Sequence, residues 1–262
     1  MCLNEVRILK RSLFILCLVI LTSCSGPSNQ KIELTVSAAA SLKDALAEIK
    51  QAFEVENENV LIYYNLGSTG SLQQQVMQGA PTDVFLSASK EHLTKLVDGN
   101  LIDRNQSADL LSNSLVVIGT NTETLKIQSL KDLSNDSIKR VSIGIPETVP
   151  AGKYAKEAMQ AENVWDEIEN KLVPAKDVRQ VLSYVESDNV QIGIVYKTDA
   201  SVSKKAKVLY EIPEGFHTPL VYSAGVVKNT KHAEEARAFY QFLQSKEAIT
   251  IFEKYGFKGL ND

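Results

Sequence analysis

The sequence predicts an α/β protein with two lobes around a cleft. Segments with strand character alternate with amphipathic helical segments along most of the chain, a pattern typical of α/β folds with largely parallel sheets. The 262 residues suffice for one large domain or two modest ones. Two apolar extended stretches, 113–119 near the middle and 219–227 near the end, indicate two crossings between lobes. Two crossings form a hinge, and a ligand cleft commonly lies beside a hinge.

The individual elements follow from the spacing of the apolar residues. Residues 32–37 alternate in the manner of a strand, and residues 41–53 place an apolar residue on one face at every helical turn. Ser41 and Asp44 resemble a capping box at the start of that helix. Further strands are predicted at 60–64, 83–88, 115–119, 140–144 and 190–196, and further helices at 72–78, 91–98, 154–161, 178–185, 233–244 and 248–255.

The N-terminus has the features of an export signal. Arg7, Lys10 and Arg11 precede an unbroken apolar run at 13–21, which is shorter than the roughly 20 residues that span a bilayer. The run ends in Leu-Thr-Ser-Cys at 21–24, which resembles the bacterial lipobox. That resemblance implies cleavage before Cys24 and a diacylglycerol group on its sulfur. An ordinary signal peptide with an incidental cysteine is the alternative.

The remaining cysteines and the charge fit an exported protein. Cleavage would remove Cys2 and Cys17, leaving Cys24 as the single thiol, and exported proteins with free cysteines risk stray disulfides. It would also shift the net charge from −4 to −6, because it removes three basic residues and one acidic residue. An acidic chain is a poor general binder of nucleic acid. The predicted parts are a signal peptide at 1–23, a tether at 24–31, lobe 1 at 32–113 plus 226–262, and lobe 2 at 114–225.

Catalytic motifs are absent from the sequence. The three histidines, His92, His217 and His232, lie far from one another and from any cysteine, so zinc-binding spacing is missing. Neither a nucleophile elbow nor a complete phosphate loop occurs. Asp177 is the best single carboxylate, and its position predicts a helix N-cap. An enzyme stays an alternative, because catalytic triads assemble in space and not in sequence.

The sequence instead contains four turns in which small or hydroxyl residues stand where a helix begins: 40–41, 68–70, 150–152 and 177–178. The first N–H groups of a helix lack internal partners and carry partial positive charge, so they can bind anions without a cationic side chain. Ser41 and Thr69 would add hydroxyl donors, and Gly67, Gly70 and Gly152 would let the backbone approach a ligand. Ordinary capping is the alternative for each turn.

Eight segments between residues 32 and 257 resemble one known family in matching order. They are AAASLKDAL (38–46), GSTGSLQQQV (67–76), GAPTDVFLSA (79–88), NSLVVIG (113–119), VPAGKYAKEAM (149–159), AKDVRQVL (175–182), GIVYKTDA (193–200) and FEKYGF (252–257). They are similar to the molybdate-binding proteins of bacterial molybdate ABC transporters. The resemblance implies a type II periplasmic-binding-protein fold with a ligand cleft between two α/β lobes.

The resemblance also implies a set of residues that bind a tetrahedral oxyanion through neutral donors. They are the hydroxyls of Ser41 and Thr69, with Ser68 in reserve, the backbone N–H groups of Ala151 and Val178, and the phenol of Tyr196. Many relatives have Ser at the position of Thr69. Arg179 follows Val178 and could clamp an anion. Because the family uses neutral groups, we expect Arg179 to form an ion pair on the helix surface instead.

The function implied is capture of molybdate, together with tungstate, and delivery to the permease of an ABC transporter. The protein would be a monomer, anchored by lipid on Cys24 to the outer face of the cell membrane, with no cofactor, no nucleic-acid partner and no catalytic activity. Three alternatives are a receptor for another oxyanion such as sulfate, an enzyme on a similar scaffold, and a sensor that uses a binding-protein fold.

Overall fold

The structure is a computed structural model that describes residues 31–260. The predicted signal peptide at 1–23, the lipid-attachment residue Cys24 and all but the last residue of the tether at 24–31 lie outside the described residues. From Ile32 onward the chain forms one compact unit. Within residues 31–260, no helix is both long enough and apolar enough to cross a lipid bilayer.

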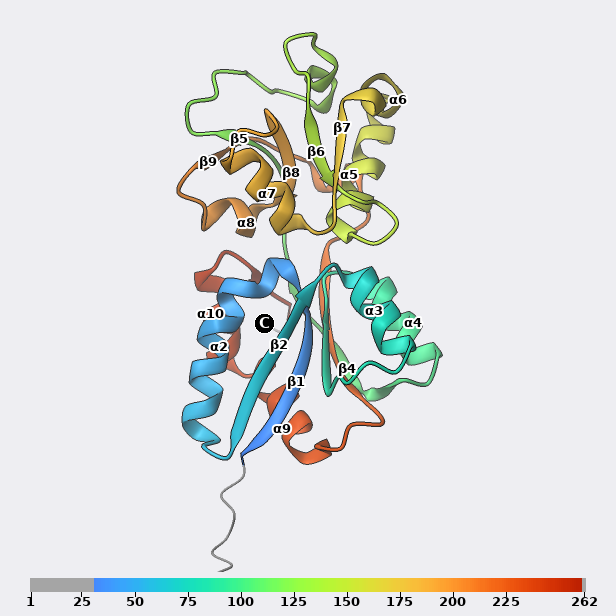
Figure 1. The fold of residues 1–262 in the computed structure, drawn as a ribbon, viewed down its shortest axis with the longest axis vertical. Helices are drawn as coiled ribbons and strands as arrows, with labels where there is room; N and C mark the ends of the chain where they lie inside the picture. Colours follow the sequence, from blue (N-terminus) through green and yellow to red (C-terminus); the bar gives the residue numbers. More distant parts are fainter. Residues whose placement is uncertain (1–30, 261–262) are drawn as a thin grey trace, which may run out of the picture. The chain divides into compact units, whose positions relative to one another are not determined.

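A six-stranded mixed sheet forms the centre of lobe 1 (Figure 1). Its strands are β1 (Ile32–Ala39), β2 (Val60–Gly67), β3 (Val84–Ser87), β4 (Ile102–Ser112), β10 (Val221–Val227) and β11 (Lys258–Gly259). They lie in the order β11-β4-β10-β3-β1-β2. β1 is parallel to β2 and β3, whereas β10 is antiparallel to β3 and β4, and β11 is antiparallel to β4.

A five-stranded mixed sheet forms the centre of lobe 2. Its strands are β5 (Leu115–Thr120), β6 (Val141–Gly144), β7 (Leu172–Ala175), β8 (Ile192–Tyr196) and β9 (Ala206–Glu211), in the order β7-β6-β8-β5-β9. β6 is parallel to β7 and β8, and β5 is antiparallel to β8 and β9. Across both sheets five of the nine pairings are antiparallel. The prediction of largely parallel sheets is therefore wrong.

Helices cover the sheets and begin near the ends of the parallel strands. Lobe 1 contains η2 (Ala40–Leu42), α2 (Lys43–Glu56), α3 (Thr69–Met77), α4 (Lys90–Asp98), α9 (Ala233–Leu243) and α10 (Lys246–Lys254). Lobe 2 contains η3 (Leu130–Ser134), α5 (Pro150–Ala161), α6 (Trp165–Ile168), η4 (Glu169–Lys171), α7 (Val178–Glu186), α8 (Lys197–Ser201) and η5 (Glu214–Phe216). In Figure 1, α2 and α10 lie on one side of the lobe 1 sheet, and α3 and α4 lie on the other.

The chain passes between the two sheets twice. The first passage joins β4 to β5 through Asn113 and Ser114, and the second joins β9 to β10 through residues 212–220. The predicted lobe boundary at 225/226 falls inside β10, because β10 pairs with β3 and β4 from Val221 onward. The apolar stretch at 219–227 is thus mostly a buried strand of lobe 1. The passage itself is the more polar segment before it.

The predicted strands and helices are confirmed within a few residues, but four strands, β4, β7, β9 and the two-residue β11, and the short helices α6 and α8 were missed. β4 has mostly polar, partly exposed residues, and β7 and β9 are the edge strands of their sheet, so none has the apolar alternation that predicts a strand. Ser41 lies in η2 and makes no side-chain cap, so the predicted capping box of Ser41 and Asp44 is wrong.

The apolar face of α2 fixes the position of η2, the short helical turn between β1 and α2. Ala45, Leu46, Ile49 and Phe53 are buried, and the Phe53 ring meets that of Phe239 edge-on with centroids 5.1 Å apart. Fully burying a side chain such as Leu46, Ile49 or Phe53 is worth about 1.5–3 kcal/mol. This packing fixes η2, and with it Ser41, at the carboxyl end of β1.

Candidate functional site

One small cavity lies between the lobes, and the volume inside it that the centre of a water-sized sphere can occupy is about 10 Å³. Its walls come from both lobes. The lining residues are Ala39, Ala40, Ser41, Gly67, Ser68, Thr69, Ala88, Val149, Pro150, Ala151, Asp177, Val178 and Tyr196. All six residues predicted to bind the anion, Ser68 included, are among them. Of these lining residues none is Lys or Arg, so the cavity wall offers no cationic side chain.

Three helices of eight or more residues begin at this cavity. Thr69 is the first residue of α3, Ala151 is the second of α5, and Val178 is the first of α7. Backbone N–H groups at these positions have no partner inside their helix. The helix dipoles add partial positive charge at the same place. The cavity is therefore lined with neutral hydrogen-bond donors, which suits a small anion.

The hydroxyl of Tyr196 is the polar group that points most directly to a bound ligand. It is the last residue of β8, only 1% exposed, and it lines the cavity. Within residues 31–260 its hydroxyl has no hydrogen-bond partner. Burial raises the pKa of Tyr196 well above its ordinary value, so the phenol keeps its proton. A buried donor without a partner costs free energy, and a bound anion would satisfy it.

Ser41 lines the cavity just after the end of β1, and its hydroxyl is hydrogen-bonded to a buried tyrosine. Its Oγ lies 2.9 Å from the hydroxyl of Tyr222 in β10. Tyr222 in turn lies 3.4 Å from Nδ2 of Asn113, at the first passage between the lobes. Neither Tyr222 nor Asn113 was singled out from the sequence. No local motif marks them, because Tyr222 is 181 residues from Ser41 in the chain.

Thr69 and Ser68 use their hydroxyls differently. The Thr69 Oγ1 accepts a hydrogen bond from the backbone N–H of Ala88 at 3.0 Å, so its own proton is free to donate into the cavity. The Ser68 Oγ caps α3, accepting from the Ser71 N–H at 3.4 Å and donating to the Ser71 Oγ at 2.8 Å. Of the two hydroxyls, only that of Thr69 has a proton available.

Asp177 is the N-cap of α7, as its position in the sequence predicts. Its Oδ1 accepts from the Gln180 N–H at 2.9 Å. It is the only charged residue among those lining the cavity. Because its carboxylate is engaged with the first turn of α7, it orients that turn and its free N–H groups.

Arg179 is directed toward carboxylates and joins the lobes. Its guanidinium lies 2.6 Å from Asp44 of α2 and 2.7 Å from Asp199 of α8. It also donates to the backbone carbonyl of Ser41 at 3.3 Å. The expected ion pair exists, but its place on the helix surface is wrong: Arg179 is largely buried and bridges lobe 2 to lobe 1. Burial raises the pKa of Asp199 to about 6 even beside Arg179.

The three glycines expected near a ligand have different roles. Gly67 lines the cavity. Gly70 approaches the other lobe instead: its N–H donates to the Thr148 carbonyl at 2.9 Å, and a Cβ on Gly70 would stand 2.7 Å from that oxygen. Gly152 packs α5 onto β6, where a Cβ would lie 1.9 Å from the Gly144 carbonyl. At Gly70 and Gly152 the lack of a side chain therefore allows close contact with neighbouring backbone, and not the approach of a ligand that the sequence predicts.

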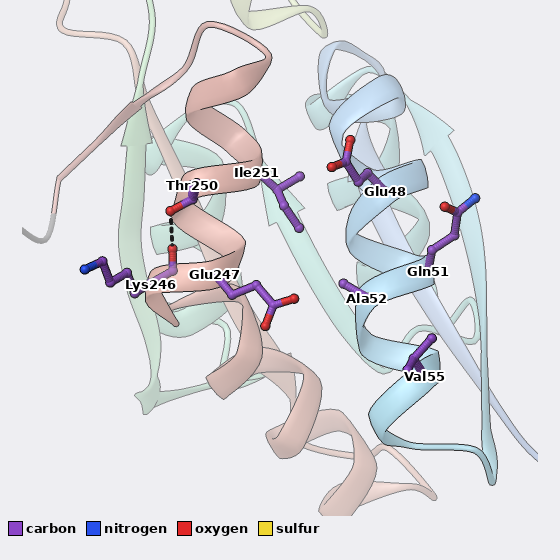
Figure 2. A pocket seen from close by; sticks show the side chains of 8 residues that line it. All are labelled: Glu48, Gln51, Ala52, Val55, Lys246, Glu247, Thr250 and Ile251. Atoms are coloured by element: carbon purple, nitrogen blue, oxygen red, sulfur yellow. Dashed lines mark hydrogen bonds between the residues drawn. The ribbon is translucent and has the colours of Figure 1, made fainter.

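A more open groove lies on lobe 1, away from these residues. Figure 2 shows that it is lined by Glu48, Gln51, Ala52 and Val55 of α2 and by Lys246, Glu247, Thr250 and Ile251 of α10. Glu48 is paired with Lys254 at 2.7 Å. Carboxylates on an open surface repel an anion, so the cavity between the lobes is the better candidate site.

Comparison with known proteins gives consistent matches over most of the chain. Residues 34–258 match the family model described as bacterial extracellular solute-binding protein. YvgL of Bacillus subtilis, whose name describes an ABC transporter substrate-binding lipoprotein, is 44% identical over 95% of this chain and 98% of its own length. The molybdate-binding protein ModA of Escherichia coli is 38% identical over 86% of this chain and 88% of its own.

A solved structure extends the match to the fold. The periplasmic molybdate-binding protein of Azotobacter vinelandii superposes with a TM-score of 0.77 at 21% identity, covering 86% of this chain and 98% of that protein. The periplasmic-binding-protein fold predicted from the sequence is confirmed.

Proposed function

The chain belongs to the bacterial extracellular solute-binding proteins, and from this premise we propose that it captures molybdate and delivers it to the permease of an ABC transporter. It carries out no chemistry on the ion and needs no cofactor. Tungstate, the tetrahedral dianion nearest in size, is the expected second ligand.

The observation that carries the proposal is the Tyr196 hydroxyl, which has no hydrogen-bond partner within residues 31–260 and is buried in a cavity of neutral donors. We assign five donors: the hydroxyls of Ser41, Thr69 and Tyr196 and the backbone N–H groups of Ala151 and Val178. A fully ionised tetrahedral dianion can accept from all of them. Thr69 is preferred to Ser68, because the Ser68 proton is already donated to Ser71.

The same donors account for selectivity. Monohydrogen phosphate brings an O–H that requires an acceptor, and an unsatisfied pair in a buried site costs about 1–3 kcal/mol. Sulfate has no proton at neutral pH, but its oxygens lie closer to its centre. Fixed donors would then be too distant on one side, and hydrogen bonds weaken as they lengthen.

The test is titration calorimetry with molybdate, tungstate, sulfate and phosphate on the purified protein and on Tyr196→Phe. We expect tight binding of molybdate and tungstate, weak binding of the others, and a loss of about 1.5–3 kcal/mol for the variant, the range for a hydrogen bond to a charged group. Tyr63→Phe is the matched control, since Tyr63 is half exposed on β2 and does not line the cavity. Sulfate or phosphate binding as tightly as molybdate would contradict the proposal.

We propose further that the protein is a monomer anchored to the outer face of the cell membrane through lipid on Cys24. The lipobox-like sequence at 21–24 and the lipoprotein name of YvgL support the anchor. Cys24→Ala should abolish both labelling by a radioactive fatty acid and correct processing, so that the protein is left unprocessed or is shed from the membrane. A Cys17→Ala variant should keep both, because Cys17 lies in the predicted signal peptide. Lipid labelling of the Cys24→Ala variant would overturn the anchor.

A further inference from the structure

Behind Ser41 lies a buried chain of hydrogen bonds that reaches the passage between the lobes. The Ser41 Oγ lies 2.9 Å from the Tyr222 hydroxyl, which lies 3.4 Å from Nδ2 of Asn113. The same Nδ2 donates to Oγ1 of Thr198 at 2.9 Å. All four side chains are buried. Asn113, Tyr222 and Thr198 are not among the residues lining the cavity, so they act on a ligand through residues that do, namely Ser41 and, by its ring contact with Tyr222, Tyr196.

The direction of this chain is determined by the Asn113 amide. Its Oδ1 accepts the backbone N–H of Ser114 at 2.8 Å, which fixes which end of the amide faces Tyr222. An amide nitrogen can only donate, so the Tyr222 oxygen accepts from Asn113. Within residues 31–260 the remaining hydrogen-bond partner of the Tyr222 hydroxyl is the Ser41 Oγ, which takes the Tyr222 proton. Burial raises the pKa of Tyr222 well above its ordinary value, so this proton is retained.

The consequence falls on Ser41. Because its oxygen accepts from Tyr222, its own proton is left to point into the cavity. We propose that Asn113 and Tyr222 are specificity-determining residues: they hold Ser41 as a donor, and so disfavour oxyanions that carry a proton. The inference rests on the proposed function and deepens it, since it names residues outside the cavity that select fully ionised ligands.

The variant Asn113→Asp should reverse the direction in which these hydrogen bonds are donated, while every residue of the network keeps its partner. A carboxylate can still accept from the Ser114 N–H and can accept from Thr198, but it has no proton to donate to Tyr222. Tyr222 would then donate to Asp and accept from Ser41. The lone pairs of Ser41 would face the cavity, where they suit the O–H of monohydrogen phosphate and repel molybdate.

The measurement is the ratio of the dissociation constants for phosphate and molybdate, obtained by competition calorimetry at mildly alkaline pH, where phosphate is the monohydrogen dianion. We expect the ratio to fall about tenfold or more in Asn113→Asp, the size of one buried hydrogen-bond mismatch. A merely structural role would weaken both anions equally and leave the ratio unchanged, which would overturn the inference.

The double variant Asn113→Asp/Tyr222→Phe is the control for the added charge. It keeps the carboxylate but breaks the connection to Ser41, so the ratio should rise from its value in Asn113→Asp to its value in Tyr222→Phe alone. A ratio that stays low in the double variant would mean that charge alone is responsible, and would overturn the inference. Tyr222→Phe alone should lower molybdate affinity more than phosphate affinity, and it carries the test if Asn113→Asp fails to fold.

The two proposals fail in different ways. If the unaltered protein does not bind molybdate, the proposed function is wrong and this inference falls with it. If it binds molybdate tightly and the ratio does not move in either variant, only the role of Asn113 and Tyr222 is wrong.

Discussion

The two lobes present different kinds of donor to the cavity between them. Lobe 1 offers the side-chain hydroxyls of Ser41 and Thr69, whereas lobe 2 offers the backbone N–H groups of Ala151 and Val178 and the phenol of Tyr196. A helix fixes the direction of its N–H groups as soon as it forms. A hydroxyl proton rotates, so a second group must orient it.

The surroundings of each donor follow that difference. In lobe 1 both hydroxyls have a buried partner behind them: Tyr222 for Ser41 and the Ala88 N–H for Thr69. In lobe 2 the N–H groups need only correct helix starts, which Pro150 and Asp177 provide. Side-chain substitutions therefore test the hydroxyl donors, Ser41 and Thr69 of lobe 1 and Tyr196 of lobe 2, whereas the N–H donors of Ala151 and Val178 must be tested through the backbone.

The largest effect is expected from removing one backbone donor in lobe 2 with Val178→Pro. Proline is favoured at the first position of a helix, and Asp177 before it is already extended, with φ −159° and ψ 170°. The variant should therefore fold while lacking the N–H. We expect a loss of about 1.5–3 kcal/mol in molybdate binding by calorimetry.

Val178→Ala is the matched control for this change. It shortens the buried side chain as proline does but keeps the N–H, so it should bind molybdate nearly as tightly as the unaltered protein. Equal losses in the proline and alanine variants would mean that the side chain of Val178, and not its N–H, matters.

The next effect tests a hydroxyl of lobe 1. Thr69→Ala should weaken molybdate and tungstate alike, by about 1–2 kcal/mol, because water can enter and partly replace the lost donor. Thr69→Ser should retain most of the affinity. Ser68→Ala should instead lower the unfolding free energy by about 1 kcal/mol through loss of the α3 cap, with little change in affinity. A Ser68→Ala variant that binds worse than Thr69→Ala would exchange the roles of the two residues.

Much of this arrangement is predictable from the sequence, because helix starts are local features. Asp177 as a cap, Pro150 at a first helical position and the glycine at 79 after α3 are each determined by neighbours a few residues away. The resemblance of eight segments to molybdate-binding proteins indicates which residue of each turn would face the ligand. The six residues that they indicate all line one cavity.

What the sequence does not predict depends on residues far apart in the chain. Tyr222 lies 109 residues from Asn113 and 181 from Ser41, so no spacing rule connects them. Arg179 meets Asp44 only because the lobes come together. The apolar run at 219–227 predicts a passage between lobes but mostly forms β10 of the lobe 1 sheet, because an apolar run does not reveal which sheet it joins.

A smaller effect should come from the contact that brings the lobe backbones together. Gly70→Ala keeps the N–H that donates to Thr148 but adds a Cβ 2.7 Å from the Thr148 carbonyl oxygen. The loop at 145–149 must yield, so we expect molybdate affinity to fall by about 1 kcal/mol, the low end for overpacking. The unfolding free energy without ligand should change little, because the higher helix propensity of alanine offsets an overpacking cost of similar size. Unchanged affinity would mean that this contact plays no part in binding.

The smallest effect is expected from the exposed ion pair that joins the lobes. Lys153 lies 2.5 Å from Glu91, and both side chains are about half exposed, so solvent screens the pair. Glu91→Gln should lower the unfolding free energy by less than about 1 kcal/mol, and less still at high salt.

The pH dependence of this effect follows from the pKa of Glu91. Hydrogen bonds from Lys153 and Lys95 lower the pKa of Glu91 from 4.5 to about 2. A lowered carboxyl pKa stabilises the folded state above the unfolded pKa, so the difference between protein and variant should persist down to about pH 4.5 and shrink as the pH falls toward 2. Denaturant titrations across this range measure it. Lys95→Gln removes the pair within α4, whereas Lys153→Gln removes the pair between lobes together with a longer pair to Glu157 within α5. A small loss of molybdate affinity in Lys153→Gln that Glu157→Gln does not reproduce would assign the effect to lobe contact. A tenfold loss of affinity in Glu91→Gln would contradict the comparison, because it would make an exposed pair as important as a buried donor.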